Sequence, residues 1–214
     1  MKIGIIGAGN VGGTLGRILT KKGHSIVFGV RDPHSTKVQA TVESTGQNAP
    51  AASVKEAAAF GEVLILAAPW NGTQEAIAQA GDLTGKIVAD ATNPIELTPA
   101  GLAAGLTAGH TTSAAEEIAK WAIGASVVKA FNNIGASCFE NLQFGTQTAT
   151  AFICGDSAQA KQVVTNLARE IGFEAMIDAG HLKPARLLEP VGMLWIHLAF
   201  SGMGQDFSIA LVQR

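Results

Sequence analysis

Residues 2–23, KIGIIGAGNVGGTLGRILTKKG, contain the pattern that decides the fold. The apolar run KIGIIG (2–7) is typical of a buried strand. Three glycines follow with the spacing GxGxxG: Gly7, Gly9 and Gly12. The stretch GGTLGRILTKKG (12–23) then places its large apolar side chains on one helical face and stops at Gly23. These residues predict a strand, a tight glycine turn and a helix in direct succession.

The same alternation of short apolar runs and longer helical stretches continues along the chain. Further strands are predicted at residues 25–30, 62–69, 86–92, 126–131, 148–155 and 174–180. Further helices are predicted at residues 53–61, 73–81, 113–123 and 157–172. Because the strands are apolar along nearly their whole length, helices should cover both faces of the sheet. We therefore expect an α/β fold, doubly wound and Rossmann-type, with a mostly parallel sheet, extra C-terminal strands and a short helical C-terminal segment.

The composition of the chain excludes several classes of protein. Its 214 residues are 47% hydrophobic and 15% charged, with a formal net charge of −2, which argues against nucleic-acid binding. Cys138 and Cys154 lie far apart and fit small core residues of a reduced, cytoplasmic protein. No apolar stretch reaches the length of a membrane span or a signal peptide, and the five histidines show no metal-ligand spacing.

The glycine turn has the context that a phosphate-binding loop requires, since it follows a strand and opens a helix. Gly7 would make the tight turn, Gly9 would let the backbone approach a pyrophosphate, and Gly12 would let helix and strand pack closely. The helix N-terminus offers free N–H groups to the phosphates. A glycine-rich turn without a ligand is the alternative. The context favours a dinucleotide-binding domain, which we expect over residues 1–180.

The end of the second strand, SIVFGVRDP (25–33), indicates which dinucleotide is bound. Val30 occupies the place where an NAD-specific site carries a carboxylate for the ribose, and Arg31 follows it. Arg31 would attract a 2′-phosphate, to which its planar guanidinium can donate two hydrogen bonds. His34, Ser35 and Lys37 could complete an anion-binding loop. NADP(H) is therefore predicted, while Asp32 as a ribose ligand, or Arg31 as a solvated loop residue, are the alternatives.

Three loops are expected to meet where the parallel strands end, the place where such sheets bind ligands. They are AAPWNG (67–72), ATNPIE (91–96) and FNNIGA (131–136). Trp70 could flank a nicotinamide ring. Asn93, with Asn132 or Asn133, could bond the ring's carboxamide, although turn formation accounts for each asparagine about equally well.

The sequence offers no clear general acid. It has no tyrosine, no histidine–carboxylate pair presents itself, and Lys129 at a strand end is more typical of a structural lysine. Hydride transfer between two ring cofactors meets this condition, because positioning supplies most of the catalysis. No catalytic side chain is therefore predicted. An NADPH-dependent reductase of a small carbonyl or imine, and an NADP-sensing protein without turnover, are the alternatives.

The C-terminal segment, residues 181–214, should complete the substrate site. The stretch LLEPVGMLWIHLAFSGMG (187–204) has a broad apolar helical face, which Pro190 should kink or break near its start. This face would pack on the sheet edge or meet a second subunit. The glycines on either side of Met203 would form a tight turn where a flat ring could approach.

Motifs along nearly the whole chain resemble those of the coenzyme F-420-dependent NADP oxidoreductases, the deazaflavin reductase family. They are GAGNVG, GVRDP, APW, DATNP, TSAAEEIA, VVKAFN, ICGD, DAG and GMG. DATNP, VVKAFN and ICGD also resemble the NADPH-binding cytosolic domain of the six-transmembrane metalloreductases. The resemblance implies NADP(H) as cofactor, coenzyme F-420 or a flavin as second substrate, and a cytoplasmic homodimer.

Residue patterns and resemblance together predict one cofactor site. Its members are Gly7, Ala8, Gly9, Asn10, Val11, Gly12, Val30, Arg31, Lys37, Ala67, Ala68, Pro69, Trp70, Thr92, Asn93, Pro94, Asn132, Asn133 and Met203. The chain departs from the family at two places. The family often has serine where Val30 stands, and archaeal relatives carry a histidine soon after PW, where PWNGTQ has none. The acceptor is therefore left open between deazaflavin, flavin and another molecule.

Overall fold

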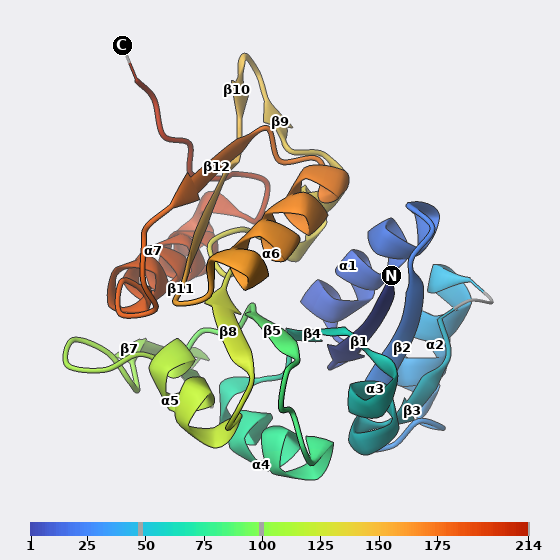
Figure 1. Ribbon diagram of the computed structural model, residues 1–214. Helices are drawn as coiled ribbons and strands as arrows, with labels where there is room; N and C mark the ends of the chain where they lie inside the picture. The colour runs from blue at the N-terminus through green and yellow to red at the C-terminus, as the bar shows by residue number, and fades with distance from the viewer. Residues whose placement is uncertain (47–48, 99–100, 214) are drawn as a thin grey trace.

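A single eight-stranded sheet runs through the molecule. The computed structural model describes residues 1–46, 49–98 and 101–213. The strand order is β12-β11-β8-β5-β4-β1-β2-β3 (Figure 1). The strands are β1 (Lys2–Ile6), β2 (Ser25–Val30), β3 (Ala51–Ser53), β4 (Val63–Leu66), β5 (Ile87–Asp90), β8 (Ser126–Lys129), β11 (Thr150–Gly155) and β12 (Ala175–Asp178). All neighbouring pairs are parallel except β8 and β11. This confirms the predicted Rossmann-type fold with additional strands near the C-terminus.

Helices cover both faces of this sheet, as its apolar strands require. They are α1 (Asn10–Lys21), α2 (Thr36–Thr45), α3 (Val54–Phe60), α4 (Trp70–Ala80), α5 (Ala114–Trp121), α6 (Ala158–Ile171) and α7 (Ala185–Leu198). One core cluster joins the sheet to α1 and α6, with Leu15 and Val164 fully buried. A second joins it to α3, α4, α5 and the start of α7, with Ala57 and Ile118 fully buried. Figure 1 shows these two layers on opposite sides of the strands.

The order of the strands reverses between β1 and β4. From β1 the chain moves outward to β2 and β3, then returns to β4 on the other side and continues to β5 and β8. The loops that leave β1 and β4 therefore diverge, and a crevice opens between them, where doubly wound sheets bind ligands.

Several strands end earlier than the sequence predicts. The strand predicted at 62–69 stops at Leu66, that predicted at 86–92 stops at Asp90, and that predicted at 126–131 stops at Lys129. Their apolar runs continue past the sheet because the loops that follow are themselves partly buried around the crevice. The residues predicted to bind a ligand consequently lie on loops or helix starts.

Some elements were not predicted at all. They are α2, β3, the hairpin of β6 (Ile95–Thr98) with β7 (Gly101–Leu106), the short pair β9 (Gln143–Phe144) and β10 (Gln147–Thr148), and a 3-10 helix at Ala136–Glu140. Thr45 is the one buried residue of α2, and only Val38 and Val42, both partly buried, face the core, so its apolar stripe is too short for periodicity to reveal. The remaining elements are too short to show a period.

Helix α7 continues through Pro190, where the sequence predicts a kink or break. It spans Ala185–Leu198 and passes into a π-helical turn at Ala199–Met203 that ends at the positive-φ residues Gly202 and Gly204. Pro190 is the sixth residue of the helix, so it removes a single backbone hydrogen bond near the N-terminal end. The buried anchors on either side, Glu189 and Gly192, hold the helix against the body of the protein.

Candidate cofactor site

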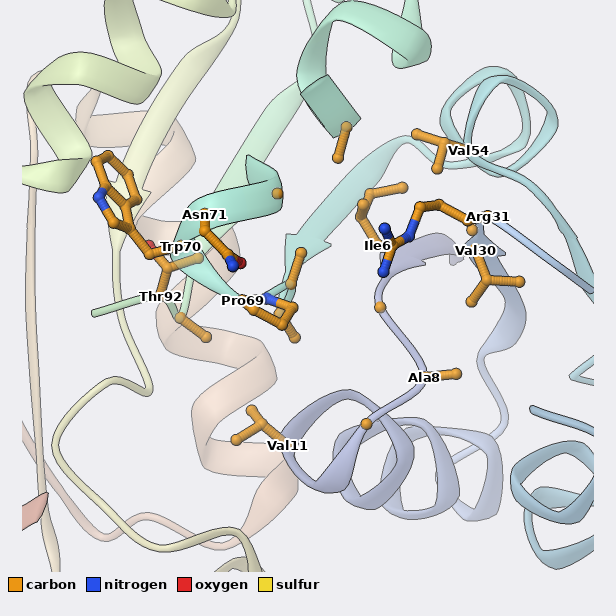
Figure 2. A pocket seen from close by; sticks show the side chains of 18 of the residues that line it. Ile6, Ala8, Val11, Val30, Arg31, Val54, Pro69, Trp70, Asn71 and Thr92 are labelled. Carbon is orange, nitrogen blue, oxygen red and sulfur yellow. The ribbon is translucent and has the colours of Figure 1, made fainter. Parts of the chain in front are cut away.

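A cavity of about 1060 Å³ lies at the carboxyl edge of the sheet, across the crevice between β1 and β4. Its walls come from the glycine loop, the end of β2, the loops after β4 and β5, one side of α4 and a single residue of α7. Figure 2 shows Arg31 and Trp70 at opposite ends, with Pro69 and Val11 between them. The volume is at the upper end of what small-molecule pockets have.

The three glycines of the loop have three different roles. Gly7 has a φ of +107° and donates its N–H to the Gly29 carbonyl at 3.0 Å, so the turn is fastened to β2. A Cβ on Gly12 would overlap the Gly7 carbonyl oxygen. A Cβ on Gly9 would meet nothing within 4 Å, because Gly9 faces the cavity. Gly12 therefore serves packing and is not in the cavity wall, whereas Gly9 leaves the backbone open to a ligand.

Helix α1 presents unpaired donors to this cavity. Its N-cap residue, Gly9, has no side chain to accept a hydrogen bond, and its first turn contains no acidic residue. Asn10 and Val11 line the cavity at that turn. The first N–H groups of a helix need acceptors and carry a partial positive charge, so this end of α1 suits a phosphate.

The end of the cavity beside β2 is cationic. Arg31, Asp32, Ser35 and Lys37 contribute to its wall, together with Val30. Asp32 is already engaged in its own turn, since its Oδ1 accepts the His34 N–H at 3.0 Å. The ion pairs formed among the described residues leave Arg31 without a carboxylate partner. Two basic side chains are thus available to an anion at this end.

The opposite end of the cavity is mostly apolar. Its wall comes from the loops after β4 and β5, the first residue of β6 and one residue of α7: Ala67, Ala68, Pro69, Ala91, Thr92, Asn93, Ile95 and Ile196. Trp70, the first residue of α4, also borders the cavity and stacks on Trp121 of α5 with ring centroids 5.5 Å apart. In Figure 2 the Trp70 indole points away from Arg31. This end suits a flat, uncharged ring.

The asparagines are used differently from the sequence-based interpretation. Asn93 borders the cavity, but its Nδ2 donates to the Asn132 carbonyl at 2.8 Å and its Oδ1 accepts from Asn132 at 3.0 Å. Asn133 is buried and donates to the Thr150 carbonyl at 3.3 Å. Neither Asn132 nor Asn133 is in the described wall. These amides hydrogen-bond to distant segments of the chain, and none of these contacts is the local turn formation that the sequence offered as an alternative.

Two further predicted residues lie outside the wall. Pro94 is buried, and its carbonyl accepts two hydrogen bonds from Thr107. Met203 is 59% exposed at the end of the π-helical turn. Sequence reasoning also missed wall residues: Val54, Glu75, Ala76, Gln79 and Ile196. The spacing of Asn71, Glu75 and Gln79 on one helical face was the available signal, but it requires a helix that starts at Trp70 and not at residue 73.

A glycine loop without Cβ obstruction, an uncapped helix N-terminus, a pair of cations and an apolar far end together fit a phosphorylated dinucleotide. The fold and this site define a dinucleotide-binding protein of the Rossmann class. The family model described as NADP oxidoreductase, coenzyme F420-dependent, matches residues 2–94.

Comparison over the whole chain is more specific. The chain is 31% identical to the F420-dependent NADP reductase of Methanothermobacter marburgensis, over 92% of each protein. A crystal structure from Arthrobacter sp. FB24, provisionally assigned as an F420-dependent NADP reductase, superposes with a TM-score of 0.91, at 28% identity over the full length of both chains. The protein belongs to the family of coenzyme F420-dependent NADP oxidoreductases, and is an NADP-dependent oxidoreductase.

A second relative is much longer. The chain is 32% identical to rat metalloreductase STEAP3 over 89% of its own length, but it spans only 36% of that protein. Among the residues described here, no helix combines the length and apolar character needed to cross a membrane.

Proposed function

We propose that the protein transfers a hydride between NADP(H) and a deazaflavin such as coenzyme F-420. The archaeal reductases that match over 92% of this chain support the proposal, because their names specify both partners. The size of the cavity supports it too, since about 1060 Å³ accommodates a dinucleotide with room at the apolar end for part of a second ring.

The residues of the cavity wall would bind NADP(H) in a single orientation, with the 2′-phosphate at the cationic end and the nicotinamide at the apolar end. Arg31 and Lys37 would bind the 2′-phosphate, and Gly9, Asn10 and Val11 would bind the pyrophosphate at the start of α1. Pro69, Thr92 and Asn93 would border the nicotinamide. When bound, the cofactor supplies a hydride, that is, two electrons and one proton; the residues around it orient the ring and exclude water.

The observation that carries the proposal is the character of the apolar end. In the described wall, the ends of β4 and β5 and helix α7 contribute no titratable side chain. The charged wall residues come from the β2 side and from α4: Arg31, Asp32, Lys37 and Glu75. Reduction of a carbonyl develops charge on one oxygen and needs a nearby acid. A conjugated ring acceptor spreads that charge and takes its proton from solvent, so this site suits a ring acceptor.

Steady-state turnover with a panel of acceptors tests the proposal. Anaerobic NADPH oxidation would be followed with coenzyme F-420, a flavin, a ferric chelate and a cyclic imine, using Gly9→Val as the control for enzyme-independent reduction. We expect stoichiometric loss of deazaflavin absorbance with wild type and none with Gly9→Val. Turnover of the imine or the ferric chelate without turnover of coenzyme F-420 would overturn the assignment of the acceptor.

The proposal also covers the roles of the two chain segments, the oligomeric state and the cellular location. We propose that residues 1–180 bind the dinucleotide and that residues 181–214 complete the substrate site, which the place of Ile196 in the cavity wall supports. We also propose a homodimer formed through the outer face of α7, where Leu187 is 69% and Leu194 is 53% exposed. Two free, buried cysteines support a reducing, cytoplasmic location.

Sedimentation analysis tests the proposed dimer. Leu194→Glu should convert a dimer to a monomer, because it would bury a carboxylate in an apolar interface. Glu75→Gln on α4 is the matched control. A wild-type monomer at micromolar concentration would refute the dimer without affecting the proposed chemistry.

A further inference from the structure

Three fully buried charges lie behind the apolar end of the cavity. Asp90 ends β5, Lys129 ends β8 and Glu189 lies in α7, and all three residues have 0% exposure. The Lys129 ammonium lies 2.8 Å from Asp90 Oδ2 and 3.0 Å from Glu189 Oε1. Burying charges is costly, so a triad of this kind persists only where its geometry is well satisfied.

Every polar group of this triad has a partner. Lys129 donates its third hydrogen bond to the Thr92 carbonyl at 2.5 Å. Glu189 accepts the backbone N–H groups of Ala114 and Ala115, at 2.9 and 3.1 Å, at the start of α5. Burial alone would lower the pKa of Lys129, but the charges of the two carboxylates raise it above its ordinary value, so Lys129 remains a cation.

The triad is directly connected to the cavity wall. Asp90 Oδ1 accepts both the N–H and the hydroxyl of Thr92, at 2.9 and 2.7 Å, and Thr92 borders the cavity. Lys129 holds the carbonyl of the same residue. The position of the turn after β5 is therefore set by two members of the triad.

Helix α7 packs against that turn beside the triad, and its Glu189 is paired with Lys129. Asn132 donates to the Leu188 carbonyl at 3.0 Å and pairs with Asn93. A Cβ on Gly192 would lie 2.6 Å from Asn93 Oδ1, so the helix backbone touches the turn directly. One turn further along α7, Ile196 enters the cavity wall. Lys129 thus contacts one wall of the apolar end through Thr92 and the helix that forms the other through Glu189.

We propose that Lys129 is a positioning residue that couples the seating of α7 to the shape of the nicotinamide end of the cavity. Lys129 touches neither cofactor nor substrate in this scheme; it acts through the Thr92–Asn93 turn and through Glu189. The inference rests on the proposed use of this cavity by NADP(H). It assigns to the triad a role in ligand affinity at one end of the cavity, beyond a contribution to folding.

Two ligands separate these roles. NADPH would occupy both ends of the cavity, whereas adenosine 2′,5′-bisphosphate has the adenosine and 2′-phosphate but no nicotinamide. Calorimetry would compare wild type, Lys129→Met and the matched control Lys120→Met, whose lysine is 65% exposed in an ion pair with Glu117. Lys129→Met should weaken NADPH binding about tenfold or more and change binding of the fragment less than about twofold. Lys120→Met should change neither.

A second variant and a measurement on wild type keep the test decisive if Lys129→Met does not fold. Glu189→Gln retains the side-chain shape and leaves Lys129 and Asp90 as a neutral pair, and it should show the same contrast between the two ligands. In wild type, NADPH should slow hydrogen exchange at the Ala114 and Ala115 amides, and the fragment should not.

Each outcome has a definite meaning. Equal weakening of both ligands in a folded variant, unchanged NADPH affinity, or NADPH-independent exchange at the start of α5 would overturn the positioning role. If wild type binds the fragment and NADPH, the proposed cofactor use stands even when the positioning role fails. If wild type binds neither, both are overturned.

Discussion

Replacing Arg31 by alanine should convert a strong preference for NADPH over NADH into a weak one. Arg31 follows the last residue of β2, is exposed and borders the cationic end of the cavity. The preceding Val30 provides no carboxylate for a free ribose hydroxyl. A 2′-phosphate placed there would accept charge-assisted hydrogen bonds from the guanidinium, and NADH has no group to receive them.

The size of the effect follows from the surroundings of Arg31. A hydrogen bond to a charged group contributes about 1.5–3 kcal/mol, which corresponds to about 10- to 150-fold in affinity. Because Arg31 is exposed, water screens the interaction, and the effect should lie toward the lower end. Lys37 borders the same end and should retain part of the preference. We expect NADPH binding to weaken about 10- to 30-fold, with NADH binding changed less than about twofold.

Dissociation constants for both cofactors, measured at one fixed ionic strength, provide the assay. Arg17→Ala is the matched control, because Arg17 pairs with Glu140 at 3.0 Å and is not in the described cavity wall. The preference should also fall with added salt in wild type, and less in Arg31→Ala. Equal weakening of both cofactors by Arg31→Ala would refute the reasoning. Asp32 as a ribose ligand would then be the better account, despite its hydrogen bond to His34.

Three further outcomes are expected. Gly9→Val should abolish NADPH binding in calorimetry while changing stability by about 0.5 kcal/mol or less, since its Cβ meets no atom within 4 Å; tight binding by the folded variant would contradict this. Burial raises the pKa of the Cys154 thiol to about 12, so iodoacetamide at pH 8 should label it only as fast as the protein unfolds; rapid native labelling would contradict this. Hydrogen bonds from Arg186 hold the pKa of Glu116 below its usual 4.5, so their contribution of about 1 kcal/mol is present above that pH and lost as pH falls through the lower, folded value. Glu116→Gln should remove this acid-dependent part of the unfolding free energy, and parallel loss of stability in both proteins would show that another group is responsible.

The strand, turn and helix at the N-terminus could be predicted because the glycines there are needed for backbone geometry within the same short segment. Gly7 needs its positive φ, and Gly12 its missing Cβ, within a few residues of the strand that they follow. Periodicity also located the amphipathic helices α1 and α6, because each has buried residues along one face over most of its length. Such features depend on residues that are close in sequence, so they can be recognised in one sequence without a structure.

The asparagines of the third loop could not be placed in the same way. Phe131, a buried aromatic residue with a φ of +63°, turns the chain before them. After this turn Asn132 bonds the Leu188 carbonyl and Asn93, Asn133 bonds the Thr150 carbonyl, and neither enters the described cavity wall. A left-handed conformation at a phenylalanine has no local signal in the sequence. Ile196 could not be predicted as a wall residue either, because it reaches the cavity only through the packing of α7 against the rest of the protein.

The stacked pair Trp70–Trp121 gives the cavity a natural optical reporter. The chain has three tryptophans, and the third, Trp195, stacks on Phe207, donates to its carbonyl at 2.9 Å and directly precedes Ile196 of the cavity wall. Reduced nicotinamide absorbs light in the range where indoles emit. A reduced ring bound at the apolar end would therefore accept excitation energy from the indoles around the cavity and quench their emission. Quenching of intrinsic fluorescence can thus follow occupancy of the apolar end without any added label.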